Sequence, residues 1–274
     1  MKTVIVPVDF SANSANAALF AGGLATFYGA SLCLYHVYEL PAAIGDFSYP
    51  VFDAAEMQAA AEHDMDLFRQ QVEGQLNATL KISTRTELNT LQEGLEALCK
   101  ETKAELVVMG LSGRGTLTRL IVGSNTIRTI YNLTCPVLVV PPGAAFSPVQ
   151  KIGFACDYKE IVKNTPLDLL KQVVKDFNAE LHVLNVDYHN RNFSPEMIQE
   201  SFDIGEILKD IKPEYHNIDS EDVTEGINWL ADRRKLDIIV VVPKKHQLVQ
   251  RIFQRSHTKD LLFHTHIPVL CMHQ

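Results

Sequence analysis

Three glycines and one serine follow a short apolar run of this chain, and their spacing could serve to bind an anion. Gly110 and Gly113 follow the apolar run 106–109, and Gly123 and Ser124 come ten residues after Gly113. Glycine lacks a Cβ atom, so its backbone can adopt positive φ and let an anion approach the N–H groups. The spacing therefore favours the binding of phosphate by the backbone.

Ser124 also marks the start of a predicted helix. Serine is a favoured N-cap, and Ile127, Ile130 and Tyr131 form an apolar stripe behind it. The first turn of a helix offers unpaired N–H donors and the positive end of a dipole to an anion. Loop and helix would then hold one polyphosphate from two sides. The alternative is that the glycines only make a tight turn and Ser124 only caps the helix.

The elements that must position these residues belong to a parallel sheet. Four apolar residues in a row, ended by a glycine, predict a strand buried on both faces of such a sheet. A second apolar strand, 4–8, ends at Asp9. Open α/β sheets bind ligands beyond the carboxyl ends of their strands, which is where the chain leaves the run 106–109.

The spacing of the three glycines and Ser124 resembles G-x2-G-x9-G-[ST], the ATP-binding signature of the universal stress protein family. The segment 4–11 is similar to that family's first strand and to the aspartate that closes it. The segment 135–140 resembles its last strand. The resemblance covers residues 1 to about 142 closely and the remainder more weakly.

This resemblance implies that the first half of the chain binds ATP together with Mg²⁺. Asp9 would contact the base or ribose region or help to hold a metal, and the backbone of Val37 would pair with adenine. Magnesium would be bound mainly through phosphate oxygens and waters, because it dehydrates reluctantly. The positions that the resemblance places beside the nucleotide are Pro7, Val8, Asp9, Val37, Met109, Gly110, Gly113, Arg114, Gly123, Ser124 and Asn125.

Two of these positions keep a structural alternative, and none is assigned a catalytic role. Asp9 could instead cap the helix that follows it, and Arg114 could be an exposed loop residue that does not contact the phosphates. The chain lacks G-x4-G-K-[ST], so the lysine that serves the β- and γ-phosphates in P-loop enzymes is missing. No general base is identified, so slow ATP hydrolysis is the most that these residues predict.

The pattern of apolar segments predicts an α/β fold. Strands are expected at 4–8, 31–37, 80–87, 106–109 and 137–140. Helices are expected from Ser11 or Asn13, over 53–77, near Leu91 and from Ser124. Five strands joined by crossover helices predict a doubly wound, five-stranded parallel sheet, and the resemblance implies the same Rossmann-like fold.

The second half of the chain repeats the first. Asp9 and Phe10 reappear as Asp157 and Tyr158, and the apolar segments that follow align at offsets of 149 and then 132. The chain therefore contains two tandem copies of one fold, expected at 1–142 and 149–274. The prolines and the glycine of the linker between them disfavour regular structure.

The second copy has lost the glycines of the signature. The residues at their places are Val242, Lys245 and Arg255, whereas the serine is retained as Ser256. One valine and two long cationic side chains cannot form a bare-backbone cradle. The second copy is therefore not expected to bind ATP in the family's manner. The basic residues between 244 and 255 could attract another anion, or they could form a solvated face.

Composition limits the partners of this chain of 274 residues. A net charge of −8 and an isoelectric point near 5.7 argue against nucleic acid or an anionic membrane as the main partner. No apolar run reaches the length of a membrane helix, and the first residues lead into a strand, so a cytoplasmic protein is expected. Five scattered cysteines without a C-x-x-C pair are interpreted as reduced core residues.

The carboxyl-terminal end is rich in histidine. His257, His264, His266 and His273 lie near Cys271, but their spacing matches no known zinc motif, so zinc binding there is an open alternative. His36, in the second strand, is interpreted as a packed residue.

The preferred hypothesis is a tandem universal stress protein that holds one ATP in its first half and transmits occupancy to an unknown protein partner. The resemblance implies that two such folds associate through their last strands. Here 137–140 and 269–272 could pair within one chain as a pseudo-dimer, which would cover two sheet edges. Further homodimerisation stays open. The rivals are an ATP hydrolase or nucleotidyl-transfer enzyme using Asp9 and magnesium, and a scaffold that binds no nucleotide.

Overall fold

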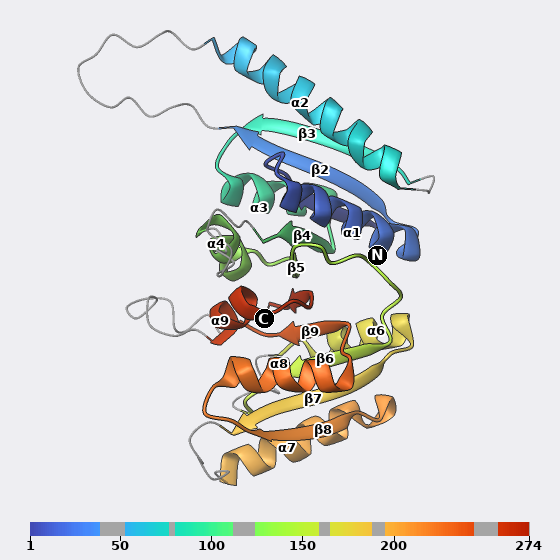
Figure 1. Ribbon diagram of the computed structural model, residues 1–274, viewed down its shortest axis with the longest axis vertical. Helices are drawn as coiled ribbons and strands as arrows, with labels where there is room; N and C mark the ends of the chain where they lie inside the picture. The colour runs from blue at the N-terminus through green and yellow to red at the C-terminus, as the bar shows by residue number, and fades with distance from the viewer. Residues whose placement is uncertain are drawn as a thin grey trace, which may run out of the picture.

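The computed structural model shows two α/β halves stacked along the long axis of the molecule (Figure 1). The structure describes residues 1–38, 53–76, 80–111, 124–158, 165–187, 195–243 and 257–273. In Figure 1 the first half, from blue to green, lies above the second half, which runs from yellow to red.

The first half alternates strands and helices as the sequence predicts. Each predicted strand begins and ends within two residues of the observed one, and Ser124 begins a helix as expected. The elements in chain order are β1 (Thr3–Pro7), α1 (Ala12–Tyr28), β2 (Ser31–Tyr38), α2 (Ala54–Gln75), β3 (Ile82–Leu88), α3 (Leu91–Thr102), β4 (Leu106–Gly110), α4 (Ser124–Asn132) and β5 (Val137–Val140).

The second half repeats this alternation. A short 3₁₀ helix, Lys209–Ile211, extends one of its α-helices. The elements are β6 (Lys151–Ala155), α6 (Leu167–Phe177), β7 (Glu180–Asp187), α7 (Pro195–Leu208), β8 (Glu214–Asp219), α8 (Val223–Arg234), β9 (Ile238–Val241), α9 (His257–His264) and β10 (Val269–Cys271).

All ten of these strands belong to one sheet. Their order is β3-β2-β1-β4-β5-β10-β9-β6-β7-β8, so each half contributes a doubly wound, five-stranded parallel sheet. The two halves join where β5 pairs antiparallel with β10, with Val139 opposite Val269 and Val137 opposite Cys271. The expected pseudo-dimer through the last strands is therefore confirmed. The edge strands of the combined sheet are β3 and β8.

Alternation along each strand divides the core between the two faces of the sheet. Leu32 and Leu34 of β2 pack on the face covered by α1 and α2, whereas Cys33 and Tyr35 pack on the face covered by α3. Successive side chains of a strand point to opposite faces, so a strand with both faces covered must be apolar throughout. This explains the continuous apolar runs in the sequence.

Helix α1 begins and ends with the signals that its sequence contains. Ser11 is its N-cap, and the Ser11 side chain accepts a hydrogen bond from the backbone N–H of Ser14. Gly29 follows the helix with φ of 62°, a left-handed conformation that costs little without a Cβ atom. The start of α1 is thereby held at the carboxyl end of β1.

Aromatic packing supports the junction between the halves. Phe27, near the end of α1, stacks on Phe177, at the end of α6, with ring centroids 4.8 Å apart and an interplanar angle of 18°. Tyr28 meets the same Phe177 ring edge to face. Contacts of this kind add about 0.5 to 1.5 kcal/mol to the burial of the rings. The two halves therefore meet through helix ends as well as through the sheet.

The cysteines fit the interpretation made from sequence. All five are free thiols, and four of them, Cys33, Cys99, Cys135 and Cys271, are buried. Within the described ranges, no helix combines the length and the apolar character needed to cross a bilayer.

Candidate functional site

The candidate site lies beyond the carboxyl ends of β2, β1 and β4. The order of strands in the first half reverses between β1 and β4, which is the switch point where open α/β sheets bind ligands. Asp9 comes two residues after β1, Val37 lies one residue before the end of β2, and Gly110 ends β4. Three of the predicted nucleotide-contacting positions are thus at one edge of the sheet.

Asp9 is exposed and is oriented by the residue that begins α1. The backbone N–H and the hydroxyl of Ser11 donate to its Oδ1 atom at 3.1 and 2.5 Å. Partial burial opposes ionisation of the Asp9 carboxyl, but the hydrogen bonds from Ser11 outweigh this effect and lower its pKa. Because Ser11 is itself the N-cap, Asp9 supports the cap and does not occupy the cap position of α1.

Phe10 gives the turn after β1 its shape. Its φ of 60° lies in the left-handed region, where a residue with a side chain is strained by about 1 to 3 kcal/mol. The Phe10 ring packs against His36 at 4.4 Å and against Phe68 at 5.8 Å between centroids, which holds this conformation. Tyr158, at the matching place of the second half, has φ of 51°. The repeat predicted from Asp9-Phe10 and Asp157-Tyr158 therefore extends to an unusual backbone conformation.

Val8 has its backbone groups engaged within the protein. Its N–H donates to the carbonyl of Tyr35 at 2.8 Å, and a ring nitrogen of His36 lies 2.8 Å from its carbonyl oxygen. The Val8 side chain is also buried. Pro7, the last residue of β1, has no N–H to donate. The backbone groups of Val8 and the nitrogen of Pro7 therefore offer no free hydrogen-bond donor to a ligand.

Gly110 has a packing role that the sequence did not predict. It does not adopt positive φ; the glycines that do so in the described ranges are Gly29 and Gly143. A Cβ atom at Gly110 would lie 2.4 Å from the backbone oxygen of Asn13, in the first turn of α1. The missing side chain therefore lets the start of α1 sit against the end of β4, and the expectation of positive φ at Gly110 was wrong.

The Met109 and Val37 side chains are taken up by the sheet and its core. Met109 is buried in β4 opposite Val139, so its side chain serves the core. Val37 is half-buried opposite Glu87 of β3. Neither side chain has a polar group that could contact a nucleotide.

The remaining predicted positions lie outside what the structure describes. Gly113, Arg114 and Gly123 fall in the undescribed range 112–123, and for Ser124 and Asn125 the structure describes the helical backbone of α4 but not the side chains. Behind them Ile127 is half-buried and Ile130 fully buried, as the apolar stripe predicts. In the second half, Lys245, Arg255 and Ser256 are likewise outside the described residues.

The carboxyl-terminal histidines do not converge where the structure describes them. Nδ1 of His264 lies 2.8 Å from the carbonyl oxygen of Asp260, and Nε2 of His266 lies 2.9 Å from Oδ1 of Asp232. A ring nitrogen of His273 contacts the carbonyl of Ile130 in the other half. Three histidines thus have three separate partners, and the side chain of His257 is not described. The described part of this end forms no zinc site.

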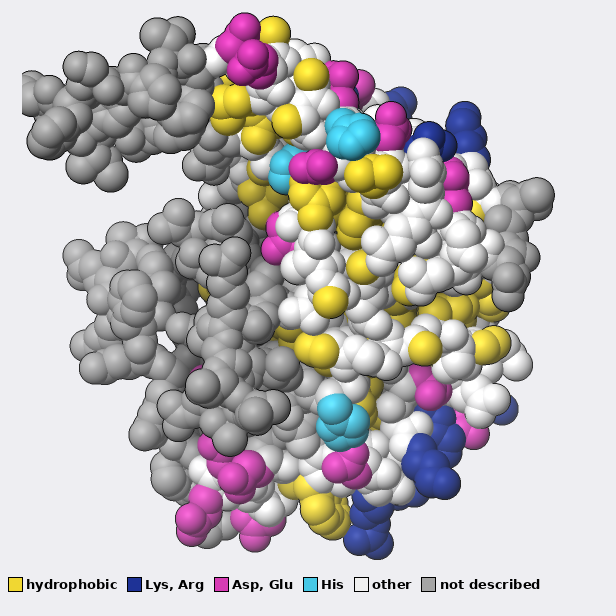
Figure 2. Space-filling view, turned by 45° about the horizontal axis from the view of Figure 1, so that its top comes forward, with side chains coloured by type: hydrophobic (Ala, Val, Ile, Leu, Met, Phe, Trp, Pro, Cys, Tyr) yellow, Lys and Arg dark blue, Asp and Glu magenta, His cyan; other side chains and the backbone are white. Residues whose placement is uncertain are grey.

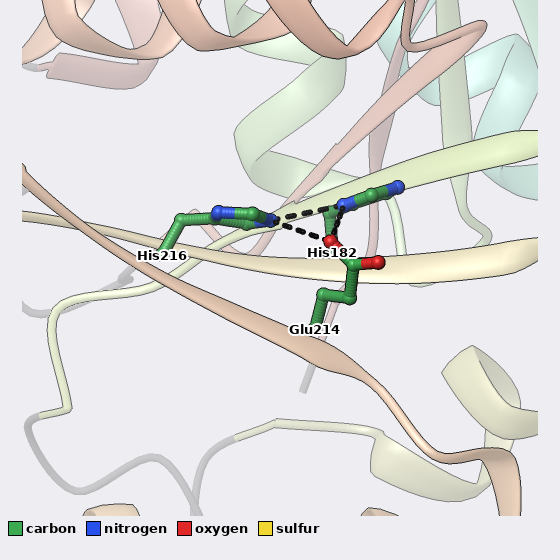
Figure 3. A group of neighbouring side chains, drawn as sticks. All are labelled: His182, Glu214 and His216. Atoms are coloured by element: carbon green, nitrogen blue, oxygen red, sulfur yellow. Dashed lines mark hydrogen bonds and ion pairs between the residues drawn. The ribbon is translucent and has the colours of Figure 1, made fainter.

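A different group of potential ligands does converge. His182 of β7 and Glu214 and His216 of β8 place three donor atoms within 4.8 Å of one another (Figure 3). Burial is the main cause that lowers the pKa of both histidines, so their neutral forms are favoured. The sequence signal is Glu214-x-His216 at the start of a strand, with alternate residues on one face. The third member could not be found without the pairing of β7 and β8.

Charge on the surface agrees with the composition. On the face that Figure 2 shows, the Lys and Arg side chains that the structure describes stand in small groups, with Asp and Glu side chains near them.

Comparisons with known proteins agree with the geometry. The model of the universal stress protein family matches residues 1–141. A universal stress protein of Methanocaldococcus jannaschii is 26% identical over 147 residues, which are 51% of this chain and 81% of that protein. One from Thermus aquaticus is 29% identical over 143 residues, which are 51% of this chain and 98% of that protein.

Solved structures match the chain over both halves. The crystal structure of a universal stress protein from Archaeoglobus fulgidus covers 99% of this chain and 98% of its own, with a TM-score of 0.74 and 17% identity. A functionally unknown protein from Pseudomonas aeruginosa covers 99% of this chain and 92% of its own, with a TM-score of 0.66 and 14% identity. At such identities the likeness concerns the fold.

Proposed function

The chain belongs to the universal stress protein family, and on that premise we propose that its first half binds one ATP, with Mg²⁺, in the crevice beyond β1, β2 and β4. The observation that carries this proposal is the placement of Asp9. An ionised carboxylate with a lowered pKa stands exposed at the switch point of the sheet, oriented by Ser11 and next to the close contact of Gly110 with Asn13.

Different residues of the proposed site would contact the adenine, the ribose and the phosphates. The backbone near Val37 would pair with adenine, and Asp9 would accept hydrogen bonds from ribose hydroxyls or orient water on the metal. The glycine-rich loop 110–123 and the start of α4 would receive the phosphates through backbone N–H groups. Magnesium would neutralise phosphate charge and keep several of its waters.

The proposed role is that of a regulatory module whose state depends on nucleotide occupancy. The second half has Val242 in place of Gly110, and this side chain is partly buried against the core. We therefore assign ATP to the first half alone, with the joined sheet as the route by which occupancy could reach a protein partner. Free thiols throughout support a reducing compartment such as the cytoplasm.

Calorimetric titration of the full chain with Mg-ATP tests this proposal. Protein freed of nucleotide should bind one ATP per chain, and Gly113→Val should abolish binding. Lys245→Gly is the matched control in the second half and should leave one site of unchanged affinity. Absence of binding by the stripped wild-type chain would favour the scaffold, and binding by Gly113→Val equal to wild type would exclude the glycine loop.

A turnover assay separates the module from an enzyme. Because the sequence supplies no P-loop lysine and no assigned base, steady hydrolysis should stay far below about one per second. Turnover at that rate or faster, lost in Asp9→Asn, would show an ATP hydrolase instead.

A further inference from the structure

We propose that His182, Glu214 and His216 form a binding site for a divalent transition metal, zinc above all, between strands β7 and β8. The distances are those of a ligand set around one centre. Nδ1 of His182 lies 3.0 Å from Nε2 of His216, and Oε2 of Glu214 lies 3.6 and 3.7 Å from these two nitrogens.

The triangle formed by these atoms has the size that zinc needs. A point equidistant from the three atoms lies about 2.0 Å from each of them, and zinc in proteins lies about 2.0 to 2.2 Å from histidine nitrogen and carboxylate oxygen. Figure 3 shows the two imidazole rings and the carboxylate pointing toward the same spot. All three atoms can therefore coordinate one ion once the ion replaces the hydrogen bond between the two imidazoles, which requires the proton shared by that bond to leave.

The pairing of two strands creates this arrangement. His182 is opposite Glu214, and Leu184 is opposite His216, in the parallel register of β7 and β8. Residues two apart on a strand face the same way, so Glu214 and His216 share a face with each other and, through the pairing, with His182. Strand β7 is paired on both sides, with β6 and β8, and the edge strand β8 is paired with β7, which holds the three Cα atoms in place.

The buried histidine has a partner on its far side. His182 is only 1% exposed, and its Nε2 atom is buried without a hydrogen bond, 3.8 Å from Oε2 of Glu180. Metal-bound histidines commonly turn their second ring nitrogen toward a carboxylate, which fixes the tautomer and the ring orientation. Glu180 is placed for that role, with the proton on Nε2 and the lone pair of Nδ1 facing the site.

The chemistry of the ligands selects among metals. Two imidazoles and one carboxylate suit zinc and neighbouring transition metals, whereas magnesium and calcium prefer ligand sets made of oxygen. The Glu214 side chain is 57% exposed, so a water can take the fourth position of the ion. The guanidinium of Arg234 lies 3.8 Å from Glu214 and competes for its charge, which sets the affinity below that of a site with no such neighbour.

The first half provides an internal comparison. In the strand register of the first half, the places of His182, Glu214 and His216 are taken by Cys33, Ser83 and Arg85. The Arg85 guanidinium is cationic and cannot coordinate a metal, so these three side chains do not form a ligand set. The proposed site is therefore a property of the second half alone.

Zinc titration of the metal-stripped full chain tests the proposal. Wild type should bind one zinc ion, and Glu214→Gln and His216→Gln should each bind at least about tenfold more weakly. His266→Gln removes an exposed histidine outside the cluster and should bind like wild type. Affinity unchanged by Glu214→Gln, or no zinc bound by wild type, would overturn the site.

Two further measurements identify the ligands of the metal and check that the variants fold. Cobalt bound at this site should give visible bands without a thiolate-to-cobalt charge-transfer band, and that band would show that cysteines hold the metal instead. Thermal unfolding without metal checks that the variants fold; Glu214→Gln changes an exposed side chain and should melt like wild type. Zinc should raise the melting temperature of wild type but not of Glu214→Gln, and an equal rise in both would contradict the assignment.

Discussion

The two halves of this chain share one fold and place their candidate sites at opposite ends of their strands. In the first half, Asp9 and Gly110 stand beyond the carboxyl ends of β1 and β4. In the second half, the histidine and glutamate cluster lies at the amino ends of β7 and β8. The glycines of the first half are missing from the second, and the metal ligands of the second are missing from the first.

What the halves retain shows what the fold itself requires. A ring nitrogen of His36 lies 2.8 Å from the carbonyl oxygen of Val8, and the amide of Asn185 donates to the carbonyl of Cys156 at 3.0 Å. Both pairs tie the end of the second strand of a half to the end of its first. A carbonyl at the end of a buried strand needs a donor, and two different side chains supply it. Scaffold contacts are thus kept although the chemistry differs.

The largest loss of stability is expected at Gly110, where the first half has no room for a side chain and the second half carries Val242. Gly110→Val would press a side chain against the carbonyl of Asn13 and should lower the free energy of unfolding by about 3 kcal/mol, with loss of ATP binding. Val242→Ala, at the matching place, should cost about 1 kcal/mol because this side chain is only partly buried. Chemical denaturation of both variants measures the contrast, and equal losses would show that the first turn of α1 has room for a side chain.

The helix glycines Gly94 and Gly226 give a second matched pair. A Cβ atom at Gly94 would lie 1.8 Å from the hydroxyl of the fully buried Tyr35, which donates to Glu87 at 2.5 Å. Gly94→Ala should therefore destabilise by about 2 kcal/mol. At Gly226 the nearest atom is 3.1 Å away, and the better helix propensity of alanine offsets the contact, so Gly226→Ala should change stability by less than about 0.5 kcal/mol. Thermal or urea unfolding would decide, and a loss at Gly226 as large as that at Gly94 would contradict the prediction.

The two hydrogen bonds that both halves retain, between His36 and Val8 and between Asn185 and Cys156, should contribute about equally to stability. His36→Ala and Asn185→Ala each leave a carbonyl without its donor, so each should destabilise by about 1.5 kcal/mol. His36→Asn places the residue of the second half into the first and should restore most of the loss. Urea denaturation of the three variants tests this, and a His36→Asn variant no better than alanine would show that the His36 ring acts through packing on Phe10.

The smallest effect concerns Asp9 and depends on pH. Its pKa is lowered in the folded state, so its contribution is present above the unfolded pKa and is lost as the pH falls through the folded pKa. Asp9→Asn should cost about 0.5 kcal/mol at pH 7, since the group is exposed, and the difference from wild type should shrink below about pH 4. Denaturation curves at pH 7 and pH 3 measure it; a difference independent of pH would mean that the charge of Asp9 does not matter for stability.

Local signals predicted much of the first half. The sequence offered Ser11 or Asn13 as the start of the first helix, and the structure selects Ser11 as its N-cap. The predicted apolar stripe after Ser124 lies in helix α4, whose first described residue is Ser124. The packing role of Gly110 was not predicted, because the sequence shows that a side chain is missing but not which atom comes close. The metal cluster was missed because His182 is 32 residues from Glu214, and only the register of β7 and β8 brings them together.

The sequence by itself determined the fold class, the repeat, the alternation of strands and helices, and the asymmetry between the two copies of the glycine signature. These follow from hydrophobic periodicity and from residue types compared at equal offsets, which are properties of the chain alone. The tertiary structure decided which distant atoms meet: Asn13 with Gly110, His36 with Val8, and His182 with Glu214 and His216. Such contacts depend on strand register and helix docking, since a shift of one residue turns every side chain to the other face of the sheet.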